Sequence, residues 1–162
     1  MSQQTELCPC GRQQSGLRLS YQTCCQPFHT VQRVAADPET LMRSRYSAFV
    51  LKQHQYLIDT HHPKHLNGLT KADLDQQELT QWLGLQVINA SNQTPIAQVT
   101  FQAWYLVDGH LDAIHEQSDF VFEDHRWWYT TGEQFQAVIP KRNMACICNS
   151  GKKFKQCCLA KV

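Results

Sequence analysis

The side chains best suited to chemistry in this chain are eight cysteines, which gather in two clusters toward its ends. In the stretch ACICNSGKKFKQCCL, a Cys-x-Cys pair is followed by eight intervening residues and an adjacent pair. We call Cys146, Cys148, Cys157 and Cys158 the C-terminal quartet. Structural zinc sites take four thiolate or imidazole ligands at tetrahedral corners, and two short segments can supply two each. Residues 149–151, Asn-Ser-Gly, favour a turn that would reverse the chain between the pairs. The spacing therefore predicts a closed zinc site, with a short helix over residues 152–158.

A second cluster repeats this arrangement with thirteen residues between its two pairs. We call Cys8, Cys10, Cys24 and Cys25 the N-terminal quartet. His29 is an alternative ligand, but four cysteines already complete the set, and a packing or surface role suits this histidine better. Both sites are predicted to hold structural Zn²⁺ without the water position that hydrolytic zinc requires, so neither quartet argues for catalysis.

Charge is nearly balanced over the whole chain but not at its end. Fifteen lysines and arginines face 14 aspartates and glutamates, which disfavours nucleic acid or an anionic membrane as a partner. No acidic residue follows Glu133, and the basic residues beyond it are Lys141, Arg142, Lys152, Lys153, Lys155 and Lys161. Four thiolates on one Zn²⁺ leave a net charge of about −2, which nearby basic side chains would partly offset. Charge balance alone accounts for the lysines, and a basic surface that binds a partner protein is the alternative.

The cysteine chemistry fits a reducing compartment. The N-terminus has no apolar run of signal-peptide length, and no segment approaches the roughly 20 apolar residues needed to span a bilayer. We therefore expect a cytoplasmic protein, in which clustered thiols favour metal binding over disulfides. A chain of 162 residues suffices for one ordinary core. The predicted organisation is a zinc motif over residues 1–30, a central α+β domain over 31–142 and a second zinc motif over 143–162.

Helical patterns occupy the first half of the cysteine-free interior. Asp37 is predicted to cap a long helix over about residues 38–59, in which apolar residues recur at helical spacing. A second helix is predicted from Thr70 through Trp82, with Gly84 placed to end it.

From Leu85 onward the pattern changes to a period of two. Residues 96–107 alternate between apolar and more polar side chains, which indicates a long strand. Asp108 and Gly109 are a strong hairpin signal, after which strands are predicted over 110–123 and 126–131. Three or four antiparallel strands that follow the helices give an α+β class.

Glu116 and Ser118 fall on the inward face of the strand over 110–123 if that strand alternates regularly. An inward carboxylate needs a partner, and Arg43 and Arg45 of the long helix are the nearest candidates. One interpretation is a structural ion pair that anchors the helix to the sheet. The other is the polar end of an apolar pocket for a small ligand, formed by Glu116, Ser118, Arg43, Arg45, Tyr46 and Trp104.

Residues 145–159 resemble the SEC-C motif, the zinc tail of the bacterial preprotein translocase ATPase, through CxC, NSGKKFKQ and CC. In that ATPase the motif contacts an export chaperone, so the resemblance implies a small protein-binding surface. The last ligand there is commonly a histidine. Cys158 takes its place here, which makes the predicted site all-sulfur.

The order CPCG, CC, LMRSRYSAFV, HEQSDF, RWWY and a terminal SEC-C motif is similar to the YchJ family of bacterial proteins. The middle of that family is similar to the nuclear transport factor 2 fold. The resemblance covers nearly the whole chain and implies a cone-shaped α+β domain, a long helix on a curved antiparallel sheet, with SEC-C zinc knuckles at both ends. It implies no reaction, because such folds host enzymes, ligand binders and interaction modules alike.

These patterns together predict a zinc-binding, non-catalytic module that engages a partner protein through its basic SEC-C tail. The alternative is a small-ligand binder or an enzyme that uses the central pocket around Glu116.

Overall fold

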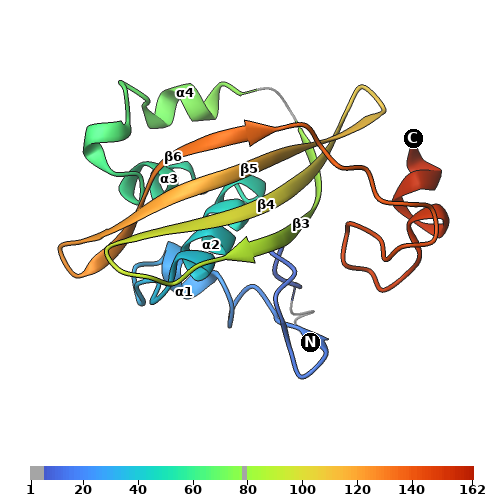
Figure 1. Ribbon diagram of the computed structural model, residues 1–162, viewed down its shortest axis with the longest axis horizontal. Coiled ribbons are helices and arrows are strands. Elements are labelled where there is room, and N and C mark those ends of the chain that lie inside the picture. The colour runs from blue at the N-terminus through green and yellow to red at the C-terminus, as the bar shows by residue number, and fades with distance from the viewer. Residues whose placement is uncertain (1–5, 78–79) are drawn as a thin grey trace, which may run out of the picture.

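The fold is built on a four-stranded antiparallel sheet, shown in Figure 1 as one curved layer. The computed structural model describes residues 6–77 and 80–162. Its strands are β3 (Gln81–Ala90), β4 (Ile96–Val107), β5 (His110–Glu123) and β6 (Arg126–Phe135), and each pairs with the next along the chain. The predicted strands are confirmed, and the last is four residues longer than the pattern suggested.

Two-residue turns set this up-and-down order. Asp108 and Gly109 both have positive φ angles, 50° and 75°, which suit the tight turn between β4 and β5. Asp124 and His125 do the same between β5 and β6, with φ angles of 53° and 61°. Register shifts interrupt the pairing at three places, two in the β3–β4 pair and one in the β5–β6 pair. Such irregularities increase local bend and twist, which gives the sheet its concave face.

Helix α2 (Pro38–Val50) lies across the concave face and contacts β3, β4 and β6. Asp37 caps it, as predicted: its carboxylate accepts a hydrogen bond from the backbone N–H of Thr40 at 2.8 Å. The prediction of one helix to residue 59 is wrong. Lys52 adopts a left-handed conformation with φ of 57°, which ends α2, and the chain restarts as α3 (His54–Asp59).

The second predicted helix is also shorter than expected. Helix α4 (Lys71–Asp75) begins at Thr70 with a capping box that Asp73 completes. Trp82 and Gly84 belong to β3 instead, because Trp82 pairs with Tyr105 across the sheet. Packing on the sheet thus overrides the helical pattern here, and residues 78–79 of that prediction lie outside the described residues.

Short elements complete the chain. They are β1 (Gln13–Gln14), β2 (Leu17–Arg18), α1 (Gln26–His29) and the 3₁₀ turns η1 (Pro63–His65), η2 (Phe154–Gln156) and η3 (Cys158–Lys161). The helix predicted over residues 152–158 is therefore a pair of 3₁₀ turns. No helix in the described part of the chain is long and apolar enough to cross a membrane.

Hydrophobic side chains pack on both faces of the sheet. On the concave side, Leu41, Met42 and Tyr46 of α2 form the main core together with strand residues and the N-terminal quartet. On the convex side, Trp104 and Phe154 belong to a second core that includes cysteines of the C-terminal quartet. Both ends of the described chain are thus part of the packed structure, one on each face of the sheet.

Candidate metal centres and the central cavity

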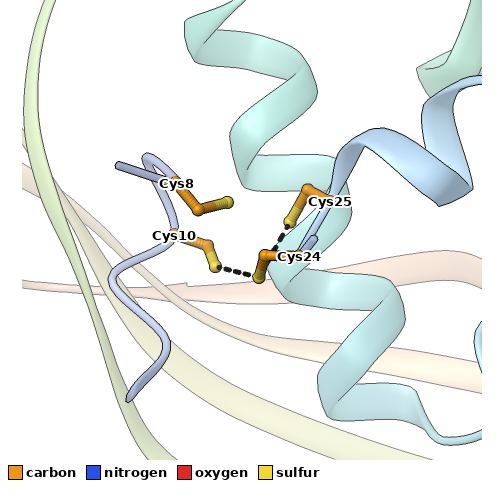
Figure 2. Close-up of side chains that lie close together, drawn as sticks. All are labelled: Cys8, Cys10, Cys24 and Cys25. Carbon is orange, nitrogen blue, oxygen red and sulfur yellow. Dashed lines mark hydrogen bonds between the residues drawn. The ribbon is translucent and has the colours of Figure 1, made fainter. Parts of the chain in front are cut away.

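The N-terminal quartet converges on one point (Figure 2). Cys8 and Cys10 come from the loop before β1, and Cys24 and Cys25 come from the turn that leads into α1. The four sulfur atoms lie within 4.8 Å of one another, with 3.6 Å between Cys10 and Cys24 and 3.9 Å between Cys24 and Cys25. A tetrahedron of sulfurs about 2.3 Å from a zinc ion has edges of about 3.8 Å. The spacing of these free thiols therefore fits a tetrahedral metal ion.

The sulfurs of this quartet differ in their affinity for protons. Hydrogen bonds from Cys10, Cys24 and Cys25 hold the pKa of Cys8 well below its usual range, and those from Cys24 and Cys25 lower the pKa of Cys10 to about 7. The bonds to Cys10 raise the pKa of Cys24 and of Cys25, which act as donors. The lowered pKa values favour the thiolate forms of Cys8 and Cys10, and the thiolate is the form that a metal ion binds.

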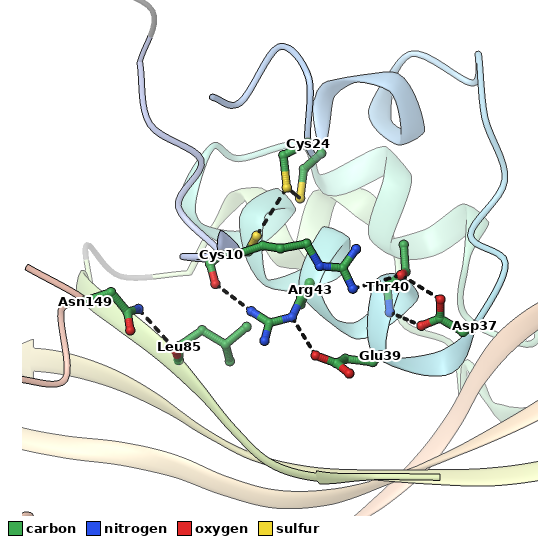
Figure 3. Close-up of polar contacts among 10 residues, drawn as sticks. Cys10, Cys24, Asp37, Glu39, Thr40, Arg43, Leu85 and Asn149 are labelled. Atoms are coloured by element: carbon green, nitrogen blue, oxygen red, sulfur yellow. Dashed lines mark hydrogen bonds and ion pairs between the residues drawn. The ribbon is translucent and has the colours of Figure 1, made fainter. Parts of the chain in front are cut away.

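Two arginines hold the first Cys-x-Cys pair from outside. Arg18 donates to the carbonyl oxygen of Cys8 at 3.3 Å. Arg43 donates to that of Cys10 at 3.0 Å, as Figure 3 shows. Arg43 also forms an ion pair with Glu39 of the same helix at 2.9 Å. The prediction that Arg43 lines a central pocket is therefore wrong, because its side chain leaves α2 toward the N-terminal quartet.

His29 is not available as a ligand in this arrangement. Its Nε2 donates to the carbonyl oxygen of Ser44 at 2.7 Å, and its Nδ1 accepts from the hydroxyl of Tyr21 at 2.8 Å. Both ring nitrogens are thus used in packing contacts, which agrees with the role expected from the sequence.

The C-terminal quartet has a similar geometry. The Sγ atom of Cys148 lies 3.5 Å from that of Cys146 and 3.5 Å from that of Cys157, and all four sulfurs lie within 4.8 Å of one another. The turn predicted at residues 149–151 is present, with positive φ angles of 59° and 80° at its first and last residues. These thiols, too, are free and fit a tetrahedral ion.

Hydrogen bonds to sulfur support this second site. The backbone N–H of Cys158 donates to Cys146, and the hydroxyl of Ser150 donates to Cys157, each at 3.5 Å. Burial raises the pKa of Cys148, but hydrogen bonds from Ser150 and Cys157 outweigh it and lower that pKa to about 6. Burial raises the pKa of Cys158. Donors directed at sulfur favour the thiolate form that a metal ion requires.

The C-terminal quartet is mounted on the convex face of the sheet. Gly84 of β3 lies directly under the backbone of Ile147, and a Cβ atom at Gly84 would overlap its carbonyl oxygen. Asn149 donates to the carbonyl oxygen of Leu85 at 3.3 Å (Figure 3). Trp104, fully buried, packs beneath the quartet.

Trp104 therefore does not line the central cavity, contrary to the prediction. The period of two along β4 places Trp104 on the face opposite Phe101 and Ala103, which do line it. The alternation of side chains along residues 96–107 could therefore have shown that Trp104 faces away from the cavity.

The two quartets approach each other across the edge of the sheet. Gly11, next to Cys10, lies so close to the side chain of Asn149 that a Cβ atom there would overlap the amide. Gly11 also has a φ of 70°, which glycine adopts without strain. The two knuckles thus pack side by side, which joins the two ends of the described chain.

A cavity of about 470 Å³ lies between α2 and the concave face. Its apolar wall includes Met42, Tyr46, Phe49, Trp82, Phe101 and Phe120. Arg45, Glu116, Ser118 and Tyr129 form a polar end. Of the six predicted pocket residues, the structure brings together Glu116, Ser118, Arg45 and Tyr46.

Neutral groups, and not an arginine, hold the carboxylate of Glu116. Ser118 donates to it at 2.6 Å and Tyr129 at 3.1 Å, and the amide of Gln134 donates to its other oxygen. The predicted ion pair with Arg43 or Arg45 is not formed. Arg43 pairs with Glu39, and no direct ion pair joins the described residues Glu116 and Arg45. Sequence reasoning missed Tyr129 and Gln134. The turn between β5 and β6 alone would place Glu133 opposite Glu116, and the register shift between Ser118 and Phe120 brings Gln134 there instead.

Comparisons with known proteins agree with this architecture. The sequence profile of the middle NTF2-like domain of YchJ matches residues 37–132, and that of the SEC-C motif matches residues 142–160. The NTF2-like α+β fold is thereby confirmed, as is the SEC-C motif at the C-terminal quartet. The resemblance of the N-terminal quartet to SEC-C stays a prediction.

Relatives cover almost the whole chain. A UPF0225 protein of Shewanella sp. strain MR-4 is 50% identical over 161 residues, 94% of this chain and 95% of its own. A UPF0225 protein of strain MR-7 is 49% identical over the same shares. The crystal structure of a SEC-C motif containing protein from Psychrobacter arcticus has a TM-score of 0.68 and 32% identity, and covers 96% of this chain and 97% of that one. The solution structure of RPA3114, a SEC-C motif containing protein from Rhodopseudomonas palustris, has a TM-score of 0.71 and 31% identity over 80% of this chain and 99% of its own.

Proposed function

The chain belongs to the YchJ family, and from this membership and the geometry of its two quartets we propose that it is a zinc protein with a non-catalytic docking role. Each quartet supplies four sulfur ligands at tetrahedral spacing, and soft thiolates in this geometry favour zinc or an iron–sulfur cluster over hard cations. Zinc is the better fit because sulfurs 3.5–3.9 Å apart suit a tetrahedron around a single ion, whose edges are about 3.8 Å. A Zn²⁺ ion in such a set has no open position, so its contribution is structural.

The observation that supports docking is the exposure of the lysines around the C-terminal quartet. Lys152, Lys153, Lys155 and Lys161 are all exposed, and none of them forms an ion pair within residues 6–77 and 80–162. Phe154 anchors the turn that carries these side chains in the convex core, and a Zn²⁺ ion bound by the quartet would fix the same backbone further. A rigid basic surface of this kind suits an acidic segment of a partner protein.

The same chemistry favours a reducing compartment. Eight free thiols in two sets remain competent for metal only where they are not oxidised to disulfides. We therefore include a cytoplasmic location in the proposal.

Capture of partner proteins by the zinc-loaded chain tests the docking role. The variant K152Q/K153Q/K155Q removes three positive charges from the quartet surface. R33Q/K52Q/K64Q removes three exposed charges elsewhere, none of them in an ion pair among the described residues, and is its matched control. Proteins captured from a bacterial lysate and quantified by mass spectrometry should be retained by the wild type and the control and lost by the first variant.

Metal analysis of the same samples separates the two explanations of the lysines. The proposal expects about two zinc ions in each of the three proteins. Equal capture by all three proteins would contradict docking. Loss of zinc together with capture in K152Q/K153Q/K155Q would also contradict it, because the lysines would then serve charge balance.

A further inference from the structure

The central cavity has the size and composition of a small-molecule site. Its volume of about 470 Å³ falls within the roughly 300–1,000 Å³ common for ligand pockets. Aromatic rings from both layers face it: Tyr46 and Phe49 from α2, and Trp82 and Phe101 from the sheet. Neither quartet contributes to its lining, so the cavity is separate from the candidate metal centres.

Arg45 brings a buried positive charge to the polar end of this cavity. Its exposed fraction is 8%, and it remains a cation at neutral pH, although burial lowers its pKa to about 10. Its Nη1 atom donates to the carbonyl oxygen of Leu57 at 2.8 Å and to the hydroxyl of Thr60 at 2.6 Å. These acceptors are neutral, and within the described ranges no carboxylate forms an ion pair with Arg45.

The remaining edge of the guanidinium can receive a ligand. A guanidinium has five N–H donors, of which Nη1 supplies two, and the other nitrogens have no hydrogen-bond partner among the residues described. One face of the group lies over the ring of Tyr129, with 4.5 Å between the Cζ atom and the ring centre. An acceptor would therefore approach along the edge, where a carboxylate accepts two parallel bonds from arginine.

Glu116 does not compete for that edge. Its carboxylate already accepts hydrogen bonds from Ser118, Tyr129 and Gln134, which leaves little acceptor capacity for a cationic ligand. Among Arg45, Glu116, Ser118 and Tyr129, the hydrogen-bond donors left without an acceptor are thus those of Arg45.

We propose that the cavity binds a small organic carboxylate with an apolar body, whose carboxylate group pairs with Arg45 and whose body packs against the aromatic wall. This site goes beyond the zinc-dependent docking role and is independent of it.

Calorimetric titration of the zinc-loaded wild type with three probes of equal chain length tests the ligand class. Octanoate, octanol and octylamine share an apolar body and differ in charge. Because a charge-assisted bond contributes more than a neutral one, octanoate should bind at least about tenfold more tightly than either of the others. Octanol of equal affinity, preferred binding of octylamine, or no binding of octanoate would each overturn the proposal.

Two variants test the location. Arg45→Met removes the charge and should abolish the preference for octanoate over octanol. Ala103→Phe fills the cavity from β4 while it leaves Arg45 in place, so it keeps the location testable if the first variant fails to fold. Ala103→Phe should lower the affinity for octanoate at least about tenfold. Arg33→Met, at an exposed position, is the control that should bind octanoate like the wild type. Unchanged octanoate affinity in Ala103→Phe, or an equal loss in Arg33→Met, would overturn the assignment.

Discussion

At the scale of single residues, Glu116 and Arg45 show how a charged pair can share a cavity without direct contact. The ring of Tyr129 lies against Arg45, and its hydroxyl donates to Glu116. Burial raises the pKa of this tyrosine, so its hydroxyl stays protonated and remains a donor at neutral pH. Tyr129 therefore lies between the two charges. Its ring stabilises the cation of Arg45, and its hydroxyl supplies one of the hydrogen bonds to Glu116.

Tyr129→Phe should destabilise the protein because it removes one donor from a buried carboxylate. A hydrogen bond to a charged group contributes about 1.5–3 kcal/mol, and two donors remain on Glu116, so we expect a loss of about 1–2 kcal/mol in the free energy of unfolding. Urea unfolding of the zinc-loaded protein measures it. Tyr105→Phe is the control, since its hydroxyl makes one long bond of 3.4 Å at an exposed site. Equal free energies of unfolding for the wild type and Tyr129→Phe would contradict this prediction, because the hydrogen bond to Glu116 would then make no net contribution to stability.

Residue types and spacing predicted more of the metal centres than of the cavity. Cysteine spacing gives the membership of each quartet directly, because two short knuckles can satisfy a tetrahedral ion by themselves. The cavity depends on which face each side chain takes and on contacts between distant segments. Arg43, for example, turns toward Cys10, a contact between distant segments that spacing along one segment cannot reveal. The face that Trp104 takes, by contrast, followed from the alternation along β4.

At the scale of elements, α2 links the candidate metal centre to the cavity. Arg43 faces the N-terminal quartet and Arg45 faces the cavity, from positions two residues apart on one helix. The start of this helix is fixed by Asp37, whose carboxylate accepts from the backbone and the hydroxyl of Thr40.

Asp37→Ala should shorten the effective helix by removing its cap. Loss of an N-cap acceptor costs about 0.5–2 kcal/mol, and the effect here should lie in the upper half of that range because two bonds are lost. Thermal unfolding monitored by circular dichroism measures it. Asp37→Asn keeps a side-chain acceptor and should retain most of the stability. If the alanine and asparagine variants melt together, the cap contributes nothing.

Gly84 is the residue of β3 on which the backbone of the C-terminal quartet packs. Gly84→Ala should push the backbone of Ile147 away from the sheet, because the added Cβ meets a carbonyl oxygen and not a flexible side chain. We expect a cost of about 1–3 kcal/mol and faster tryptic cleavage after Lys152, Lys153 and Lys155. Ile88→Ala, at an exposed position of the same strand, is the control. A cleavage rate equal to that of the wild type would contradict this contact.

Strands were more predictable than helix ends. The period of two and the turn residues of the hairpins are local signals, and they gave β4 and β5 with correct bounds. The break at Lys52 and the switch to β3 before Trp82 are not local. They depend on how α3 and Trp82 pack against the rest of the core.

At the scale of the whole molecule, the two ends of the described chain close around one domain. The N-terminal quartet belongs to the main core on the concave side, whereas the C-terminal quartet covers Trp104 on the convex side. Gly11 and Asn149 bring the two knuckles into contact. The sequence predicted two terminal metal motifs, but it could not show that one of them is part of the main core.

The number and kind of metal ions in freshly reduced protein test the central claim most directly. Native mass spectrometry combined with elemental analysis should find two zinc ions per chain. The variants C8S/C10S and C157S/C158S should each retain one, because each removes half of one quartet and leaves the other complete. Iron in place of zinc, a count near zero, or disulfides within either quartet of the freshly reduced protein would contradict the account.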